Sequence, residues 1–198
     1  MRIIAGEAKG RRLRSLKGTV LRPTADRVRE ALFARLGDRT YGARFLDLYA
    51  GVGAVGLEAL SRGAAEAVFV ESHRPAARVI EQNAAACGFS DRLRLLVLPV
   101  SRALVRLDRE GAQFDLLFLD PPYGIGEASV GLRALANRPH LIAPAGLVIC
   151  QHSRREDVPA QIGAFAGMKQ ARFGETVVDF YHLKDGSGEQ QRPSDGAV

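Results

Sequence analysis

From Phe45 onward, short apolar runs alternate with segments of helical character, and this alternation restricts the chain to one class of fold. The apolar runs predict strands at residues 44–50, 67–71, 93–98, 114–119 and 146–151. Helices are predicted between them at residues 56–62, 75–87, 101–107 and 128–136, with another near Ala160. Such alternation is typical of a mostly parallel sheet with helices on both faces.

The C-terminal part of the chain is predicted to close this sheet with a hairpin. Residues 168–173 and 177–183 have the character of strands, and the connection Gly174, Glu175 and Thr176 is short enough for a hairpin. One of the two strands must then run antiparallel to the others. We therefore predict an α/β fold with a seven-stranded, mostly parallel sheet that contains one antiparallel strand.

A glycine-rich turn follows the first predicted strand. Its glycines, Gly51, Gly53 and Gly56, match the pattern G-x-G-x-x-G between a strand and a helix, and Glu71 ends the second strand 20 residues after Gly51. This is the pattern of dinucleotide-binding turns, in which the backbone approaches the ligand closely and the acid binds ribose hydroxyls. A nicotinamide-dependent dehydrogenase is therefore one hypothesis. The plainer interpretation of Glu71 is a surface acid at a strand end.

Asp47 points to a different ligand. It lies inside the first strand, four residues before Gly51, where a buried carboxylate needs a cationic partner or good hydrogen bonds. S-adenosylmethionine carries an ammonium and a sulfonium group and would supply such a partner. The alternative is that Asp47 only stabilises the turn through local hydrogen bonds.

Asp120, Pro121, Pro122 and Tyr123 directly follow the apolar run of residues 114–119. Two prolines cannot continue a central strand because neither has an N–H to donate. The four residues therefore form a stiff corner at the carboxyl end of a strand, the edge where open α/β sheets bind ligands. A carboxylate, a free carbonyl and a flat ring suit a planar amine, such as the amino group of a nucleobase. The alternative is a structural turn with a capping Asp and a core Tyr.

The positive charge is concentrated in the first 44 residues. They hold twelve Lys or Arg and four acidic residues, a net charge of +8, whereas the remainder holds 16 basic and 18 acidic residues. A basic segment on a nearly neutral body favours contact with a polyanion such as nucleic acid, although an arginine-rich solvated face is possible. Residues 2–5 and 12–16 could pair as a hairpin across residues 6–10. A helix capped by Thr24 or Asp26 follows, with Val28, Leu32 and Leu36 on one face.

Other features indicate a soluble, intracellular protein. Cys87 and Cys150 lie in different predicted elements without metal-ligand spacing, which favours two reduced cysteines. Met1 is followed closely by charged residues rather than by the apolar core of a signal peptide, and no apolar stretch approaches membrane-spanning length.

The combined motifs resemble those of a known enzyme family. Asp47, Gly51, Gly53, Glu71 and the tetrad 120–123 resemble a class I S-adenosylmethionine-dependent methyltransferase that acts on amino groups. The segments that resemble the ribosomal small-subunit methyltransferase D family are residues 1–6, 10–13, 22–33, 45–51 and 56–64. The resemblance runs from residue 1 to about residue 183. It implies a Rossmann-like class I methyltransferase that transfers a methyl group to N2 of one guanine in 16S rRNA.

The resemblance also implies roles for particular residues. The catalytic tetrad would be Asp120, Pro121, Pro122 and Tyr123. The residues expected to bind S-adenosylmethionine are Asp47, Gly51, Gly53, Gly56, Glu71, Ser72 and Ser101. The residues expected to bind RNA are Arg2, Lys9, Arg11, Arg12, Arg14, Arg22 and Arg27. No metal is expected. The sequence departs from the family at Val52, in the glycine turn. Many class I methyltransferases also carry an acid or amide after the third strand that contacts the adenine, and residues 99–102 hold none there, so backbone groups or Ser101 are expected to recognise the adenine.

We expect three regions: a basic extension over residues 1–40, a methyltransferase domain over residues 41–183 and a polar, disordered tail over residues 184–198. The implied partner is 16S rRNA in a small ribosomal subunit or an assembly intermediate, bound by a cytoplasmic monomer without membrane contact. The alternatives are a DNA adenine or protein glutamine methyltransferase, the dehydrogenase, and a non-catalytic RNA-binding assembly factor.

Overall fold

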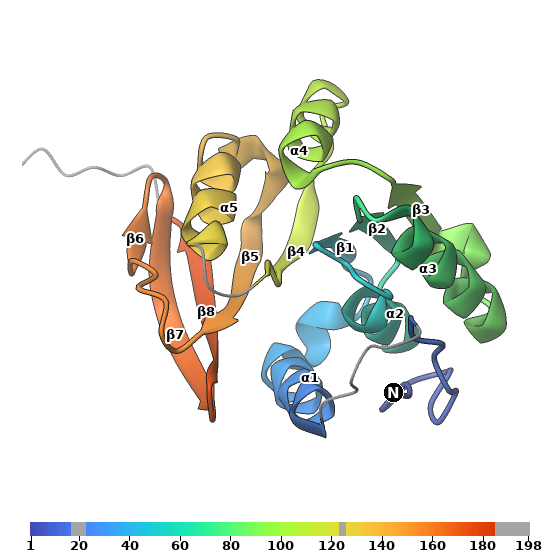
Figure 1. Cartoon of the computed structure of the whole chain (residues 1–198). Coiled ribbons are helices and arrows are strands. Elements are labelled where there is room, and N and C mark those ends of the chain that lie inside the picture. The colour runs from blue at the N-terminus through green and yellow to red at the C-terminus, as the bar shows by residue number, and fades with distance from the viewer. Residues whose placement is uncertain (17–22, 123–125, 185–198) are drawn as a thin grey trace, which may run out of the picture.

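The computed structural model describes residues 1–16, 23–122 and 126–184, and its centre is one eight-stranded sheet. The strands are β1 (Arg44–Leu48), β2 (Glu66–Val70), β3 (Leu93–Leu96), β4 (Phe114–Leu119), β5 (Ile142–Ser153), β6 (Gln161–Ile162), β7 (Phe165–Phe173) and β8 (Thr176–Leu183). Their order is β3-β2-β1-β4-β5-β8-β7-β6. The first five run parallel, and β8 lies antiparallel between β5 and β7. The predicted Rossmann-like α/β fold is confirmed (Figure 1).

The predicted number of strands and the last predicted helix are wrong. The sheet has eight strands, because the two-residue strand β6 lies where a helix was predicted near Ala160 and pairs antiparallel with β7. Val158, Ile162 and Phe165 have the spacing of a helical stripe, but Pro159 and Gly163, which has φ of +52°, interrupt it. The segment instead buries Ile162 as an edge strand. The sheet therefore contains two strands, β6 and β8, that run against the parallel set.

Helices cover both faces of the sheet, as predicted. On one face lie α1 (Pro23–Leu36), α2 (Ala54–Ser61) and α3 (Arg74–Cys87), which enclose a core that includes Phe45 and Phe69. On the other lie α4 (Val100–Arg109) and α5 (Glu127–Ala136), around a core that includes Leu117. Short 3-10 turns are η1 (Gly37–Thr40), η2 (Ser90–Arg92) and η3 (Pro139–Leu141). Figure 1 shows the helix α4 at the end of the molecule opposite to the N-terminus.

Helix α1 has the predicted buried face but not the predicted cap. Val28, Leu32 and Leu36 are all buried. The helix begins at Pro23, so Thr24 and Asp26 lie within its first turn rather than at the cap position. Proline is common at the first helical position because its missing N–H has no partner there in any case.

Residues 1–16 form an irregular arm, which we call the N-terminal arm. A single bridge between Arg2 and Arg12 replaces the predicted pair of strands, although the chain does fold back on itself there. Ile3 and Leu13 are buried in the same core as α1, α2 and α3. In Figure 1 the arm, in dark blue, lies beside α2.

Two polar residues of α2 hold the N-terminal arm. The carboxylate of Glu58, which is fully buried, accepts the backbone N–H groups of Ile4 and Ala5 at 2.8 and 3.0 Å. The hydroxyl of Ser61 donates to the carbonyl of Ala5 and accepts the N–H of Ala8. Because these bonds satisfy backbone groups that are shielded from water, the arm is fixed to the helix rather than loosely apposed.

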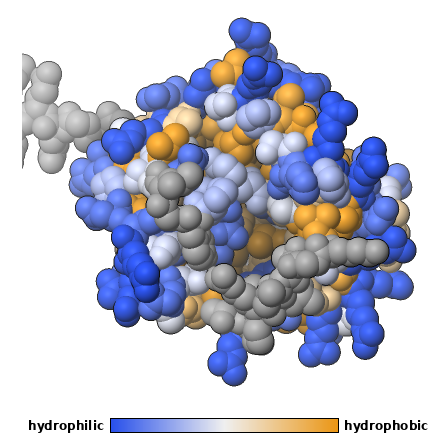
Figure 2. Space-filling view, in the orientation of Figure 1, coloured by the Kyte–Doolittle hydropathy of each residue, from blue (hydrophilic) through white to orange (hydrophobic). Residues whose placement is uncertain are grey.

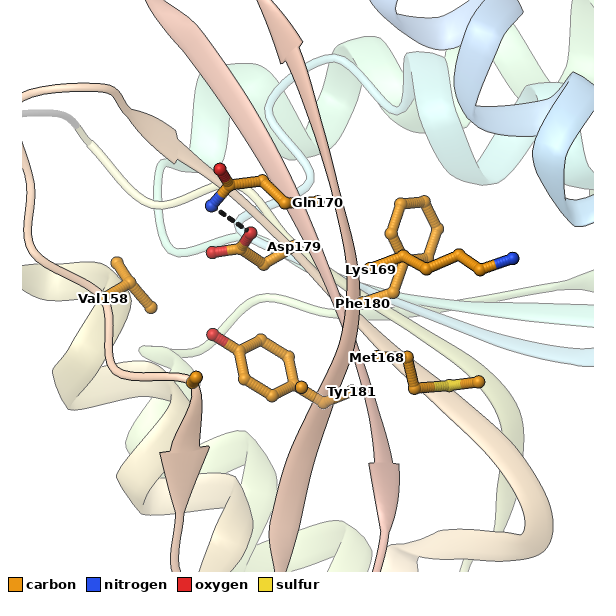
Figure 3. A pocket seen from close by; sticks show the side chains of 9 residues that line it. Val158, Met168, Lys169, Gln170, Asp179, Phe180 and Tyr181 are labelled. Atoms are coloured by element: carbon orange, nitrogen blue, oxygen red, sulfur yellow. Dashed lines mark hydrogen bonds between the residues drawn. The ribbon is translucent and has the colours of Figure 1, made fainter.

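The far edge of the sheet carries a buried polar network. His152 bonds through Nε2 to Asp179 at 2.9 Å, and the amide of Gln170 donates to the other oxygen of Asp179 at 2.8 Å. Figure 3 shows Asp179 and Tyr181 pointing toward the segment that carries Val158, across a pocket of about 240 Å³. Among the described residues, none of those predicted for the functional site lines this pocket.

Neither a membrane span nor a metal cluster occurs in the described part of the chain. No helix among residues 1–16, 23–122 and 126–184 has the length and apolar character needed to cross a membrane. No group of three metal-ligating side chains occurs in the same ranges. Cys87 and Cys150 are both free, and burial raises the pKa of each thiol.

Candidate active site at the carboxyl edge of the sheet

Three carboxylates converge where neighbouring parallel strands end. Asp47 lies in β1, Glu71 follows β2 and Asp120 follows β4, and β1 pairs with both other strands. The N–H of Asp120 points to the carbonyl of Leu48 at 3.4 Å, which holds the end of β4 against β1. Because parallel strands end at one edge, residues far apart in the sequence meet there.

The glycine turn is held over this edge by Asp47. One carboxylate oxygen of Asp47, which is 2% exposed, accepts the backbone N–H of Gly56 at 2.9 Å. Gly53 has φ of +81° and is the N-cap residue directly before α2, and a Cβ on Gly56 would lie 2.4 Å from the ring of Phe69. The turn therefore requires glycine for a left-handed backbone at one position and for close packing at the other.

Glu71 is also bonded to the backbone of the site. One of its oxygens accepts the N–H of Gly51 at 2.8 Å, and the other accepts the N–H of His73 at 2.7 Å. The residue is only partly exposed. It therefore ties the start of the glycine turn to the end of β2, and this position is not that of a free surface acid.

The site raises the pKa of two of its acids. Burial raises the pKa of Asp47 to about 7, against the lowering effect of the Gly56 hydrogen bond, and the nearby charges of Asp120 and Glu71 raise it further. Desolvation likewise raises the pKa of Asp120 to about 7, and a hydrogen bond with Gln151 opposes the rise. Clustered carboxylates with raised pKa values favour a cationic ligand, because a positive charge relieves their repulsion and their desolvation.

The structure describes three of the four residues of the tetrad. Asp120 is partly exposed, Pro121 is buried and Pro122 is exposed, whereas Tyr123 lies outside the described residues. Gln151 on β5 contacts Asp120 and was not predicted as a site residue. It lies one position past the register partner of Leu119, so only the pairing of β4 with β5 reveals the contact.

Tyr49 was also missed by sequence reasoning. It is the one residue other than glycine with a positive φ in the described part of the chain, at 64°, and it lies between β1 and the glycine turn. The phenol oxygen of Tyr49 lies close to Gly131 of α5, since a Cβ on that glycine would be 3.4 Å from it. Burial raises the pKa of Tyr49 to about 12. Such strained residues gather at ligand sites, but an aromatic residue in a strand gives no sequence signal of strain.

Asn83 is a third missed residue. It lies on the buried face of α3, 1% exposed, and its amide donates to the carbonyl of Val52 in the glycine turn at 3.0 Å. A polar residue among the buried positions Ala76, Ile80 and Ala84 was the signal that could have revealed it.

The two serines predicted to bind the cofactor lie outside the buried part of the site. Ser72 and Ser101 are both exposed. Ser72 follows Glu71 directly, and Ser101 lies in the first turn of α4. Their position leaves both hydroxyls accessible from solvent.

Six of the seven residues predicted to bind RNA lie within the described part of the chain, and all six are exposed. Arg2, Lys9, Arg11, Arg12, Arg14 and Arg27 are all exposed, and Arg22 lies outside the described residues. The arm that carries five of them shares its core with α1, α2 and α3, the helices that cover the Asp47 face of the sheet. Figure 2 shows a recess with apolar residues at its base near the centre of the view.

Comparisons with known proteins place the chain among methyltransferases. The family model of Conserved hypothetical protein 95 matches residues 1–182. The chain is 32% identical over 181 residues to "Putative rRNA methyltransferase YlbH" of Bacillus subtilis, a match that covers 91% of this chain and 98% of that protein. It is 39% identical over 134 residues to ribosomal RNA small subunit methyltransferase D of Escherichia coli K12, a match that covers 67% of this chain and 66% of that protein. Among solved structures, "Putative methyltransferase yhhF" of Escherichia coli superposes with a TM-score of 0.80 at 30% identity, covering 93% of this chain and 98% of that one.

Proposed function

The chain belongs to the ribosomal small-subunit methyltransferase D family, and from this premise we propose that it methylates the exocyclic N2 of a guanine in 16S rRNA. The observation that carries the proposal is the position of Asp120 and Pro121 at the end of β4, beside the carboxylates of Asp47 and Glu71. An amine acceptor and a cationic methyl donor would meet at this edge.

The residues at the sheet edge fit S-adenosylmethionine as the methyl donor. The clustered carboxylates of Asp47, Glu71 and Asp120 favour a ligand that carries an ammonium and a sulfonium group. Glu71 is partly exposed beside the first glycine, where a carboxylate can accept ribose hydroxyls. Gly53 and Gly56 keep the backbone of the turn free of side chains. Ser72 and Ser101 are exposed next to this edge and are proposed to complete the cofactor site.

Asp120 and Pro121 have the chemistry needed to position an amino group. A guanine N2 is a weak nucleophile because its lone pair is delocalised into the ring. The ionised carboxylate of Asp120 and the carbonyl of Pro121 would each accept one N–H, which turns the lone pair toward the methyl group. Positioning and electrostatics of this kind supply most of the rate in such transfers. Tyr123 is proposed to stack on the base, which must leave its helix or loop to enter the site.

Bound by the glycine turn, Asp47 and Glu71, S-adenosylmethionine would supply a methyl group to the amine nitrogen, and the electron pair of the broken carbon–sulfur bond would stay on sulfur. The nitrogen then carries one surplus proton. Asp120, whose pKa is about 7, can accept this proton or pass it to water. No strong base is required, because the alkylated amine is acidic.

The N-terminal arm is proposed to hold the RNA. Arg2, Lys9, Arg11, Arg12 and Arg14, together with Arg27 and Arg22, would contact phosphates, which gives affinity without reading the sequence. The proposed substrate form is 16S rRNA in a small subunit or an assembly intermediate, bound by a monomer in the cytoplasm. The names of the curated relatives support ribosomal RNA as the substrate class.

The proposal is tested by methyl transfer from labelled S-adenosylmethionine to 16S rRNA, and to small subunits from cells that lack this protein. The labelled nucleotide and atom are then mapped. Label on guanine N2 is the expected result. Label on adenine N6 would overturn the choice of base, and label on protein alone would overturn RNA as the substrate. Binding of NAD without any methyl transfer would favour a dehydrogenase.

A further inference from the structure

The buried amide of Asn83 connects two parts of the protein that are distant in sequence. On one side it donates to the carbonyl of Val52 in the glycine turn at 3.0 Å. On the other side it pairs with the backbone of Arg14 in the N-terminal arm: it donates to the Arg14 carbonyl at 3.1 Å and accepts the Arg14 N–H at 2.7 Å. Both amide protons and the amide oxygen of Asn83 are therefore bonded to backbone groups.

These three bonds depend on each other because Asn83 is only 1% exposed. If Arg14 moves away, the amide loses two partners in a place that water does not freely reach. If Val52 moves away, one amide proton is left without a partner. A buried polar group without a partner is unfavourable, because it has given up its hydrogen bonds to water and gained none in return. The arrangement is therefore favourable only when the arm and the glycine turn are both in position.

The arm and the turn are also the two places where the proposed ligands bind. The arm carries Arg11 and Arg12 beside its contact with Asn83, and the glycine turn is the proposed cofactor site. RNA that holds the arm against α3 therefore holds Asn83 in the orientation that fixes Val52. A cofactor that fixes the turn likewise favours the docked arm.

We propose that Asn83 is a positioning residue that couples the two sites, so that RNA on the arm and S-adenosylmethionine at the glycine turn each increase the affinity for the other. This inference rests on the proposed function. Linkage requires the two effects to be equal. The element with two arrangements is the segment of residues 12–16, docked on α3 through Asn83 or released from it. A coupling of about 5-fold to 20-fold is expected, within the usual range for linked sites.

The coupling is measured as a ratio of affinities. The dissociation constant of S-adenosylhomocysteine is determined by calorimetry with and without saturating 16S rRNA transcribed in vitro. The RNA affinity is then measured with and without S-adenosylhomocysteine. In the unchanged protein we expect the same factor of about 5 to 20 in both directions. In Asn83→Ala the factor should fall below about 2, and the KM for each substrate should stop depending on the concentration of the other.

Gln82→Ala is the matched control. Gln82 precedes Asn83 on α3 and accepts the Arg14 guanidinium at 3.0 Å, and among the hydrogen bonds of the described residues its side chain makes none to the glycine turn. The change removes an exposed contact with the same arm residue and leaves the bonds of Asn83 in place, so the coupling factor should survive. Asn83→Asp is a second variant, which keeps the acceptor for the Arg14 N–H but removes both amide donors. Coupling should be lost in this variant too, and it provides the test if Asn83→Ala does not fold.

Two results would overturn the inference while the proposed function stands. One is a factor of 1 in an unchanged protein that binds both ligands and methylates RNA. The other is a factor that persists in folded Asn83→Ala or Asn83→Asp. If the unchanged protein binds neither S-adenosylhomocysteine nor RNA, the proposed function itself fails, and the two failures are thereby told apart.

Discussion

The carboxylate of Asp47 accepts the N–H of Gly56 at 2.9 Å from beneath the glycine turn, while the same carboxylate is almost completely buried. The turn therefore sits on an acid whose charged form is disfavoured until a cation approaches. The hydrogen bond between Asp47 and Gly56 therefore fixes the backbone of the turn and also places a carboxylate directly beneath it. The position of Asp47 serves both interpretations of the sequence, because the residue stabilises the turn and also places negative charge under the proposed cofactor site.

Replacing Asp47 by Asn should stabilise the ligand-free protein and weaken cofactor binding. The folded-state pKa of Asp47 is raised above its ordinary value, so the stability that its protonated form provides is present at low pH and is lost as pH rises through about 7. Asn can still accept the Gly56 N–H. The melting temperature of Asp47→Asn should therefore exceed that of the unchanged protein by more at pH 8 than at pH 5. S-adenosylhomocysteine binding, measured by calorimetry at pH 8, should weaken at least about tenfold. If the difference in melting temperature between the two proteins is the same at pH 5 and pH 8, the pKa of Asp47 is not raised.

Removing the Asp120 carboxylate should abolish methyl transfer and leave cofactor binding within a few-fold. Asp120→Ala removes the acceptor for the amine, whereas the glycine turn and Glu71 remain bonded as before. In the unchanged protein kcat/KM should rise with pH through about 7, because the carboxylate must be ionised to accept the amine N–H. Single-turnover transfer and S-adenosylhomocysteine titration are the two measurements. Wild-type turnover in Asp120→Ala would exclude the proposed role.

Gly6 and Gly10 form a matched pair on the N-terminal arm. Both have φ of +81°, but a Cβ on Gly6 would lie 1.7 Å from the carbonyl oxygen of Ser61, whereas a Cβ on Gly10 would meet nothing within 4 Å. Gly10→Ala should cost only the left-handed backbone term of about 1–2 kcal/mol. Gly6→Ala carries the same term and must also push the arm off α2, so it should destabilise by at least about 2 kcal/mol more. Urea unfolding of both variants gives the comparison, and equal losses would mean that the arm is not held at Ser61.

Reversing two charges of the arm should weaken RNA binding and reduce its dependence on salt. Arg11 and Arg12 are exposed, and their change to Glu would remove two of the proposed phosphate contacts. The slope of log K against log salt should become shallower by about 1.5. The control changes the exposed Arg109 of α4 and Arg133 of α5 to Glu, the same change in net charge on the opposite face of the sheet. If the RNA affinity of the arm variant is unaltered, Arg11 and Arg12 do not bind RNA and are only solvent-exposed charges.

His152 and Asp179 should contribute stability that disappears at high pH. The ring nitrogens of His152 lie at hydrogen-bond distance from the Ser153 carbonyl and the Asp179 carboxylate, both acceptors, so the two bonds form together only when both nitrogens carry a proton. Burial lowers the pKa of His152, but the bonds to Asp179 and Ser153 raise it more, and the net shift is upward. Stability from this pair is therefore complete below the ordinary histidine pKa and is lost as pH rises through the raised value.

The test of this pair is Asp179→Asn, which leaves the buried imidazolium without its counter-charge. It should cost about 3 kcal/mol at pH 6 and less at pH 9, because a higher pH favours the neutral ring, which needs no counter-charge. Urea unfolding at the two pH values measures the difference. A loss that does not change with pH would show that His152 is neutral in the folded state.

The sequence predicted the parallel part of the sheet well and its far edge poorly. The strands β1, β2 and β4 bury almost all of their side chains, so their apolar runs are unambiguous. Around Ala160 the apolar spacing is that of a helix, and only the pairing of Ile162 with Phe165 shows that the segment is a strand. Local periodicity cannot include the hydrogen bonds that an edge strand gains from its neighbour.

The sequence by itself determined the class of fold, the glycine turn and the presence of acids at the ends of three strands, because these depend on the order and spacing of residues along the chain. Tertiary structure alone decided which groups satisfy the buried polar atoms. It brought Gln151 to Asp120, Glu58 to the backbone of Ile4, and Asn83 to both Val52 and Arg14. These partners are 31 to 69 residues apart, and no spacing rule connects them. Their pairing follows from packing, because a buried donor or acceptor takes the partner that the folded chain places beside it.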